Sequence, residues 1–104
     1  MFARKVSLHL KSNSVAEFTQ RLEKDILPLL RKQKGFQDEI TFVAQGGKEA
    51  FAISLWDKPE NADTYNRGTY PEVTKMLATV TEGAPQVETF DVANSTFHKI
   101  AVAA

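Results

Sequence analysis

The stretch EAFAISLWDKPENADTY, Glu49 to Tyr65, decides the fold, because a buried strand in it runs directly into a helix. Ala50 to Trp56 is a nearly continuous apolar run, too short for an independent helix and typical of a strand covered on both faces. Asp57 is a favourable helix N-cap, and Glu60 stands three residues further on, as in a capping box. The stretch therefore predicts a central strand, a short turn and a helix, and it should form one wall of any pocket.

A hairpin is predicted immediately before this strand. Gly46-Gly47 lies between two strand-like runs, and glycine adopts the positive φ of a tight turn at no steric cost. Phe36 to Ala44 should therefore pair antiparallel with Glu49 to Trp56. The apolar residues of the earlier run that share one parity are Phe36, Ile40, Phe42 and Ala44.

The chain begins with a second strand-like pattern, Phe2 to Leu10, in which apolar and polar residues alternate. Lys5, Ser7 and His9 occupy the polar parity, and Arg4 interrupts the apolar one. This alternation predicts a half-buried first strand.

A helix should follow, because Ser14 and Glu17 have the spacing of a capping box. Its apolar residues recur at spacings of three and four and are Val15, Phe18, Leu22, Ile26 and Leu29. Pro28 lacks an N–H group and should kink this helix or end its regular part, and Gly35 is the expected stop.

The second half of the chain predicts a broken helix and a fourth strand. Asn66-Arg67-Gly68 interrupts the helix, and Thr69 to Glu72 restarts it with a second capping box. Gln86 to Val92 is the predicted strand, with Val87, Phe90 and Val92 buried. Thr96 to Val102 is predicted to form a further short strand.

This order, β-α-β-β-α-β with a C-terminal extension, predicts an α+β fold, the ferredoxin-like split βαβ arrangement. The helices should cover one face of the sheet. A two-fold dimer would bury the other face against a second sheet, forming a dimeric α/β barrel. We expect one domain over residues 1–104, with the extension 95–104 at the dimer interface.

Composition excludes several classes of protein. Thirteen basic and thirteen acidic residues cancel in the 104-residue chain, so no global field favours nucleic acid or an anionic membrane. The chain has no cysteine, which excludes disulfides and thiolate metal sites. The N-terminus lacks the apolar core of a signal peptide, and a cytoplasmic protein is expected.

Short motifs resemble those of the antibiotic biosynthesis monooxygenase-like (ABM) superfamily. The turn Arg31-Lys32-Gln33-Lys34-Gly35-Phe36 resembles its R-K-Q-x-G-F turn, and Trp56-Asp57 is similar to the W-[DE] end of its third strand. Val87 to Val92 is similar to its V-E-x-F-x-V strand, and Tyr70 fits the start of its last helix. The resemblance covers residues 2–92.

The resemblance implies a homodimer with a pocket between the sheet and the helices of each subunit. Some members are cofactor-free monooxygenases that act on aromatic, polyketide-like substrates, and others degrade haem. Lys75 stands where the axial histidine of the haem-degrading members would be, and a protonated lysine cannot ligate iron. The resemblance therefore implies chemistry without a cofactor.

His9, Tyr65 and Tyr70 are the predicted catalytic residues. A histidine has a pKa near neutrality and could deprotonate a phenol. The two tyrosines flank the broken helix, where they could orient a phenolic substrate at a pocket mouth. The alternatives are a solvent-facing or dimer-facing histidine and tyrosines that serve packing.

Trp56, Asn66 and Arg67 are the predicted ligand-binding residues. Trp56 could form an aromatic pocket wall, and Arg67 could clamp an anionic or carbonyl group. The plainer alternatives are core packing for Trp56 and a polar turn at Asn66 and Arg67. No metal site is predicted, because the two histidines are far apart and no helical HxxxH or HxxE pair exists.

Three functions fit this pattern. The first is a cofactor-independent monooxygenase acting on a small aromatic or quinol-type substrate, with an electron-rich substrate that itself activates oxygen. The second is a non-catalytic dimeric protein, a binding or stress-related module that holds a small apolar ligand. The third is a structural dimer whose pocket is filled by Phe and Leu side chains.

Overall fold

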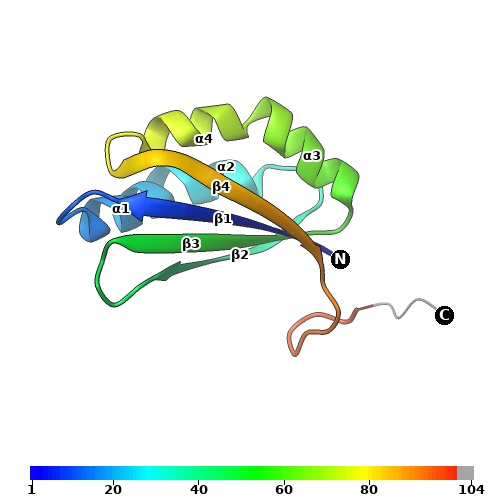
Figure 1. Ribbon diagram of the computed structural model, residues 1–104. Coiled ribbons are helices and arrows are strands. Elements are labelled where there is room, and N and C mark those ends of the chain that lie inside the picture. The colour runs from blue at the N-terminus through cyan, green and yellow to red at the C-terminus, as the bar shows by residue number, and fades with distance from the viewer. Residues whose placement is uncertain (101–104) are drawn as a thin grey trace.

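The computed structural model describes residues 1–100 and shows an α+β fold, with one layer of helices over one face of a four-stranded sheet (Figure 1). The elements in chain order are β1 (Phe2–Leu10), α1 (Val15–Arg21), the π-helical segment η1 (Leu22–Ile26), α2 (Leu27–Arg31), β2 (Phe36–Val43), β3 (Glu49–Trp56), α3 (Pro59–Gly68), α4 (Tyr70–Leu77) and β4 (Thr81–Asp91). The predicted fold class is confirmed. Among the helices of this described part, none is long and apolar enough to cross a membrane.

The strand order is β2-β3-β1-β4, and every neighbouring pair is antiparallel. β1 and β2 run parallel with β3 inserted between them, which is the split βαβ arrangement. We call the face toward the helices the inner face and the opposite one the outer face. β3 is central, as predicted.

The hairpin between β2 and β3 forms where the glycine pair predicts it. Gly47 has φ +71°, and the Ala44 N–H donates to the Glu49 carbonyl at 2.8 Å. The predicted parity of β2 is wrong, because the pairing register shifts between Phe36 and Asp38. Such a bulge rotates the strand, so Phe36 packs against Trp56 on the inner side while Phe42 lies on the outer face.

The first helical region is irregular near Pro28. Proline has no N–H for the carbonyl four residues earlier, and the helix widens to π geometry over η1 before resuming with Pro28 in the first turn of α2. Gly35 then turns the chain with φ +81°. A Cβ there would lie 2.1 Å from the Asp57 carboxylate oxygen Oδ1, so only glycine fits.

Side-chain capping was predicted at three helix starts and does not occur at any of them. The Ser14 hydroxyl donates to the Ser12 carbonyl instead, at 3.4 Å. Lys58, not Asp57, is the N-cap of α3, and Asp57 accepts a hydrogen bond from the Asn61 side chain at 2.8 Å. α4 continues almost directly from α3, so Thr69 has helical φ and ψ and no capping bond.

The hydrophobic core lies between the inner face and the helices. Its fully buried large residues are Trp56, Phe18 and Val80. Trp56 ends β3, Phe18 comes from α1, and Val80 precedes β4. The core therefore joins both helical regions to the two central strands.

β4 is longer than predicted and is interrupted. Ser7 pairs with Gln86, but His9 pairs with Glu82, so extra residues bulge out of β4. Val87 and Phe90, predicted to be buried, are 42% and 48% exposed. β4 is an edge strand, and Val87 borders a shallow hollow beside α3 rather than the core.

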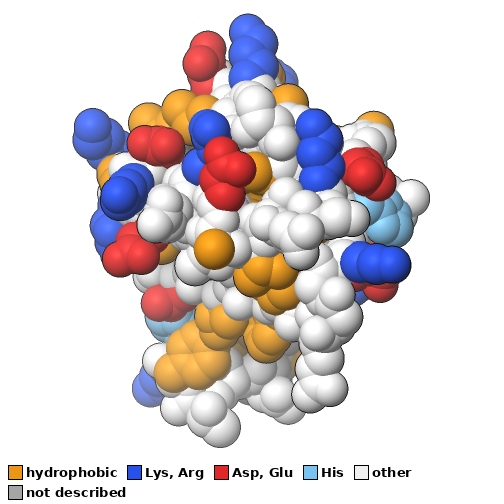
Figure 2. All heavy atoms as spheres, turned by 90° about the vertical axis from the view of Figure 1, so that its left-hand side faces the viewer, with side chains coloured by type: hydrophobic (Ala, Val, Ile, Leu, Met, Phe, Trp, Pro, Cys, Tyr) orange, Lys and Arg blue, Asp and Glu red, His pale blue; other side chains and the backbone are white. Residues whose placement is uncertain are grey.

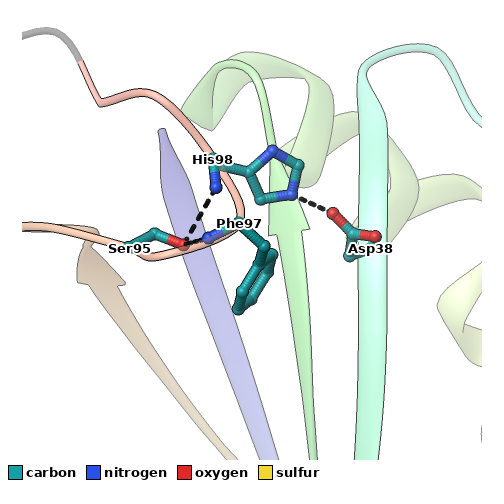
Figure 3. A network of polar contacts seen from close by, with 4 residues as sticks. All are labelled: Asp38, Ser95, Phe97 and His98. Atoms are coloured by element: carbon teal, nitrogen blue, oxygen red, sulfur yellow. Dashed lines mark hydrogen bonds and ion pairs between the residues drawn. The ribbon is translucent and has the colours of Figure 1, made fainter.

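Residues 92–100 form no strand, so the predicted C-terminal strand is wrong as far as residue 100; its last two residues lie outside the described part. From the end of β4 the chain descends on the outer side of the sheet (Figure 1). There the Ser95 hydroxyl accepts hydrogen bonds from the N–H groups of Phe97 and His98, and the His98 ring contacts Asp38 of β2 (Figure 3). The interface position of this extension stays a prediction.

Candidate active site

A cavity of about 300 Å³ lies between the inner face and the helices. Its apolar walls on the helix side include Phe18, Leu22, Ile26, Val73 and Leu77. On the sheet side they include Val6, Leu8 and Ala52. A partly open apolar cavity of this size is that of a small-molecule site at the lower end of the usual range, roughly 300 to 1,000 Å³. The cavity also contradicts the alternative of a pocket filled by side chains.

Three polar residues cross the inner face as a row. Arg4 pairs with Ser54, and Ser54 pairs with Glu39, so the three lie at one level on β1, β3 and β2. All three line the cavity. Neighbouring strands are about 4.8 Å apart, which places the backbones of Arg4 and Glu39 about 10 Å apart. We call Arg4, Ser54 and Glu39 the polar row.

Arg4 is the charged group of this site, with only 4% of its surface exposed. Its Nη2 donates to the Asn66 amide oxygen at 2.8 Å. Its guanidinium lies 4.0 Å from the ring centre of Tyr70 and 5.4 Å from that of Tyr65, both cation–π contacts. No ion pair within residues 1–100 includes Arg4.

Tyr65 and Tyr70 meet at the break between α3 and α4, with their ring centres 6.1 Å apart. Burial raises the pKa of Tyr65 to about 12, although the charge of Arg4 opposes that rise. Burial also raises the pKa of Tyr70, and the charge and the nearby N–H groups of Arg4 oppose that rise. The Tyr70 hydroxyl is buried and has no hydrogen-bond partner within the described residues. Both phenols therefore stay protonated at neutral pH and can act as hydrogen-bond donors.

Glu39 is the carboxylate in the cavity lining. Burial raises its pKa, and the hydroxyl of Thr41, which donates to its Oε2 at 2.6 Å, limits the rise. A carboxylate with a raised pKa is a stronger base than an ordinary one, which is the property a general base needs.

Trp56 supports the site from behind. It is fully buried and does not line the cavity. Its indole N–H donates to the Ser54 hydroxyl oxygen at 2.9 Å, and its ring centre lies 5.2 Å from that of Tyr65. Trp56 therefore does not form the predicted aromatic wall but packs in the core, and Tyr65, against which it lies, lines the cavity instead.

The structure brings some of the predicted site residues together and separates others. Tyr65 and Tyr70 line the cavity, whereas Asn66 lines the separate hollow beside α3 and reaches the site only through its hydrogen bond to Arg4. His9 points to the outer side, 66% exposed, and faces Glu49 at 3.7 Å. Arg67 is 72% exposed and pairs with Asp63 one helical turn earlier, at 3.1 Å. Neither His9 nor Arg67 reaches the cavity.

Arg4, Glu39 and Ser54 were not predicted as site residues. For Arg4 the sequence held a signal, because a charge interrupts the apolar parity of β1. Within residues 1–100 no three His, Asp or Glu side chains are placed to hold a metal ion. The arrangement can therefore enclose an aromatic ring, offer a cation and hydrogen-bond donors at one end, and offer one proton acceptor across the sheet.

Comparison with known proteins supports the fold. No family model matches the sequence, and no curated protein matches it. Among solved structures, SnoaB, a cofactor-independent oxygenase from Streptomyces nogalater, has a TM-score of 0.75 at 10% identity, over 93% of this chain and 97% of that chain. A candidate antibiotic biosynthesis monooxygenase from Bordetella bronchiseptica has a TM-score of 0.74 at 14% identity, over 89% and 98%.

A third similar structure, a Nitrosomonas europaea protein of unknown function, has a TM-score of 0.71 at 16% identity, over 94% of each chain. The chain thus has the fold of the ABM structures, and the predicted resemblance is confirmed at that level. Identities this low establish the fold and leave the reaction to be argued from the site.

Proposed function

We propose that the protein is a cofactor-independent monooxygenase and that its cavity binds a small aromatic substrate of the quinol type. The observation that carries this proposal is the apolar cavity with Arg4, Tyr65, Tyr70 and Glu39 converging on it. A closed apolar space with a few placed polar groups is the usual form of a small-molecule site. The likeness to a cofactor-independent oxygenase supports the same reaction class.

In the proposed reaction the quinol supplies all the electrons. One atom of O2 forms a bond to a ring carbon, the other leaves as water, and a quinol plus O2 becomes a hydroxyquinone plus water. Glu39 accepts a proton from the substrate hydroxyl, which makes the ring electron-rich enough to reduce O2. Tyr65 and Tyr70 orient the ring, and the apolar walls exclude water.

Oxygen uptake and quinone absorbance, followed together across a panel of quinols, test this proposal. We expect one quinone formed per O2 consumed and no hydrogen peroxide, since peroxide would mark simple oxidation without oxygen insertion. Glu39→Gln should lower kcat at least 100-fold, the usual size of a general-base contribution. Glu23→Gln, on the exposed side of η1, is the matched control and should retain the full rate. Equal rates in both variants, or no turnover of any quinol, would reject the proposal.

The second candidate function is a binding protein without turnover. The specific observation in its favour is that both tyrosines have raised pKa values, which leaves Glu39 alone as a proton acceptor in the cavity lining. Thermal stabilisation by an aromatic ligand, with no oxygen uptake, would favour this function. A ligand at about 100 times its dissociation constant adds roughly 2.7 kcal/mol of stability.

A homodimer joined through the outer face is part of the same proposal. Large apolar residues on this face are open to solvent, with Ile40 46%, Phe42 44% and Phe90 48% exposed. In Figure 2 hydrophobic side chains gather in the lower part of the molecule, below charges of both signs. Sedimentation should give a dimer mass for the native protein and a monomer mass for Phe42→Asp. A native monomer at micromolar concentration would reject it.

A further inference from the structure

We propose that Arg4 forms an anion-binding subsite, so that the cavity selects aromatic ligands bearing an ionised oxygen on a planar carbon, as in a carboxylate or a phenolate. This inference rests on the proposed function, since it specifies the substrate class of the same cavity. It concerns binding alone and can be tested without turnover.

The first argument is the cost of the buried charge. Arginine stays charged at any pH that proteins tolerate and is almost never fully buried without a partner. Arg4 is 4% exposed, yet its hydrogen-bond partner is the neutral amide of Asn66. Glu39 lines the same cavity, but no oxygen of it lies within ion-pair distance of the guanidinium. The positive charge is therefore left for a ligand to neutralise.

The second argument is the number of free donors. A guanidinium has five N–H donors in a flat fork that matches a planar oxyanion. One donor of Arg4 is used on Asn66, and the rings of Tyr65 and Tyr70 lie 5.4 and 4.0 Å from the centre of the guanidinium. The Tyr70 hydroxyl, buried beside it, makes no hydrogen bond of good geometry within residues 1–100, although the guanidinium is close enough to act on its pKa. A ligand oxygen placed between them would pair with both.

The third argument is the shape of the rest of the cavity. Beyond the polar row the walls are apolar, from Val6 and Leu8 on the sheet and Val73 and Leu77 on α4. A ligand with its anion at Arg4 would place its aromatic body against these walls. A purely structural role for Arg4, tying α3 to β1 through Asn66, would leave its remaining donors and the Tyr70 hydroxyl unexplained.

The test compares 1-naphthoate with 1-naphthamide, which have nearly the same shape but differ in charge at neutral pH. Calorimetry should give a dissociation constant at least tenfold lower for the carboxylate, about 1.4 kcal/mol. In Arg4→Gln this ratio should fall to near one, and in Arg4→Lys, which keeps the charge but loses the fork, it should lie between. Arg31→Gln, an exposed arginine on α2, is the matched control and should retain the full ratio.

A second arm distinguishes phenolates from carboxylates. 4-Nitrophenol absorbs visible light only when ionised, so its spectrum reports the pKa of the bound phenol. That pKa should be lower in the native protein than in solution and should rise again in Arg4→Gln. A positive result in either arm supports the subsite and names the anion that it takes.

Equal binding of naphthoate and naphthamide together with an unshifted nitrophenol would overturn the inference. So would an undiminished preference in Arg4→Gln. If Arg4→Gln does not fold, the ratio of the naphthamide to the naphthoate dissociation constant is compared between the native protein and Arg4→Lys. Tyr70→Phe should lower this ratio but not reduce it to one. Quinol turnover without any anion preference would overturn this inference and leave the proposed function standing. Anion preference without turnover would support the subsite and reject the proposed monooxygenase.

Discussion

The two faces of the sheet are made by the same four strands, but each breaks the rule that charged residues are exposed and large apolar residues are buried. The inner face buries a charge, and the outer face exposes apolar side chains. The inner face is largely apolar but carries the polar row, in which Arg4 is almost completely buried. The outer face exposes large apolar side chains such as Phe42 and Phe90. A buried charge and an exposed apolar cluster are the two arrangements that ordinary folding does not favour. Each is therefore the basis of one of the proposals above, a ligand on the inner face and a second subunit on the outer face.

The kind of missing contact differs between the faces. On the inner face a buried cation lines a cavity of about 300 Å³, which suits the small anionic ligand proposed above. An exposed apolar sheet face is flat and wide, which suits another protein surface. The inner face is thus where chemistry is expected, and the outer face is where assembly is expected.

The largest expected difference between the faces appears when a phenylalanine is removed from each side of the sheet. Phe18 is fully buried against the inner face, and Phe18→Ala should cost about 3–5 kcal/mol of unfolding free energy. Phe42 is 44% exposed, and Phe42→Ala should cost about 1 kcal/mol or less in the monomer. Urea unfolding at several protein concentrations measures both. A large cost for Phe42 that disappears on dilution would show that the outer face is buried in an assembly.

The next largest effect concerns Tyr65 of α3, which lies on the inner side of the sheet. The pKa of Tyr65 is raised to about 12, so the folded state keeps this phenol neutral while the unfolded chain ionises it near pH 10. Stability is therefore full below pH 10 and falls as the pH rises toward 12, by roughly 2–3 kcal/mol at most. Tyr65→Phe should remove that part of the alkaline loss. An unchanged alkaline profile in the variant would mean that Tyr65 is solvated.

A smaller effect is expected from the other end of the polar row. Burial raises the pKa of Glu39, so the folded state favours the protonated acid. The resulting stability is full below the pKa of the unfolded chain and is lost as the pH rises through the folded value. Glu39→Gln should therefore be more stable than the native protein at pH 7, by on the order of 1 kcal/mol, and equal to it at acidic pH. A variant that is less stable at pH 7 would contradict the burial of this carboxyl.

Much of the fold could be predicted because its signals are local. The apolar run of β3 and the glycine pair before it each depend on a few neighbouring residues. The helix break was predicted too early in the chain, because α3 continues through Asn66 and Arg67 to Gly68 and only Thr69 separates it from α4. The capping predictions failed for a related reason, since a serine or aspartate can make other local hydrogen bonds. Ser14 bonds the Ser12 carbonyl, and Asp57 bonds Asn61. Which of these bonds forms depends on the approach of the chain from outside the helix.

The site could be predicted only in part, because it combines strands that are far apart in the sequence. The tyrosines were predicted from the helix break that carries them. Glu39 was not, because the bulge between Phe36 and Asp38 reverses the parity of β2 and turns this carboxyl inward. Arg67 was predicted because a break in the helix would have put it in a loop, where ligand contacts are common, but it lies within α3 and pairs with Asp63 one turn earlier.

The smallest expected effect concerns the segment that crosses the outer face. His98 contacts Asp38 there, and nearby outer-face residues Leu55 and Ala3 are buried although no helix covers them. We infer that the segment 92–100 covers these two residues. His98→Ala should detach this segment and speed amide exchange over 92–100. It should lower the free energy of unfolding by less than about 1 kcal/mol, as the loss of a partly exposed polar contact does. Phe42 lies further along the outer face and is exposed even when the segment 92–100 is in place. The assembly state of His98→Ala should therefore equal that of the native protein. A change of mass on sedimentation would show instead that the segment itself takes part in the contact between subunits.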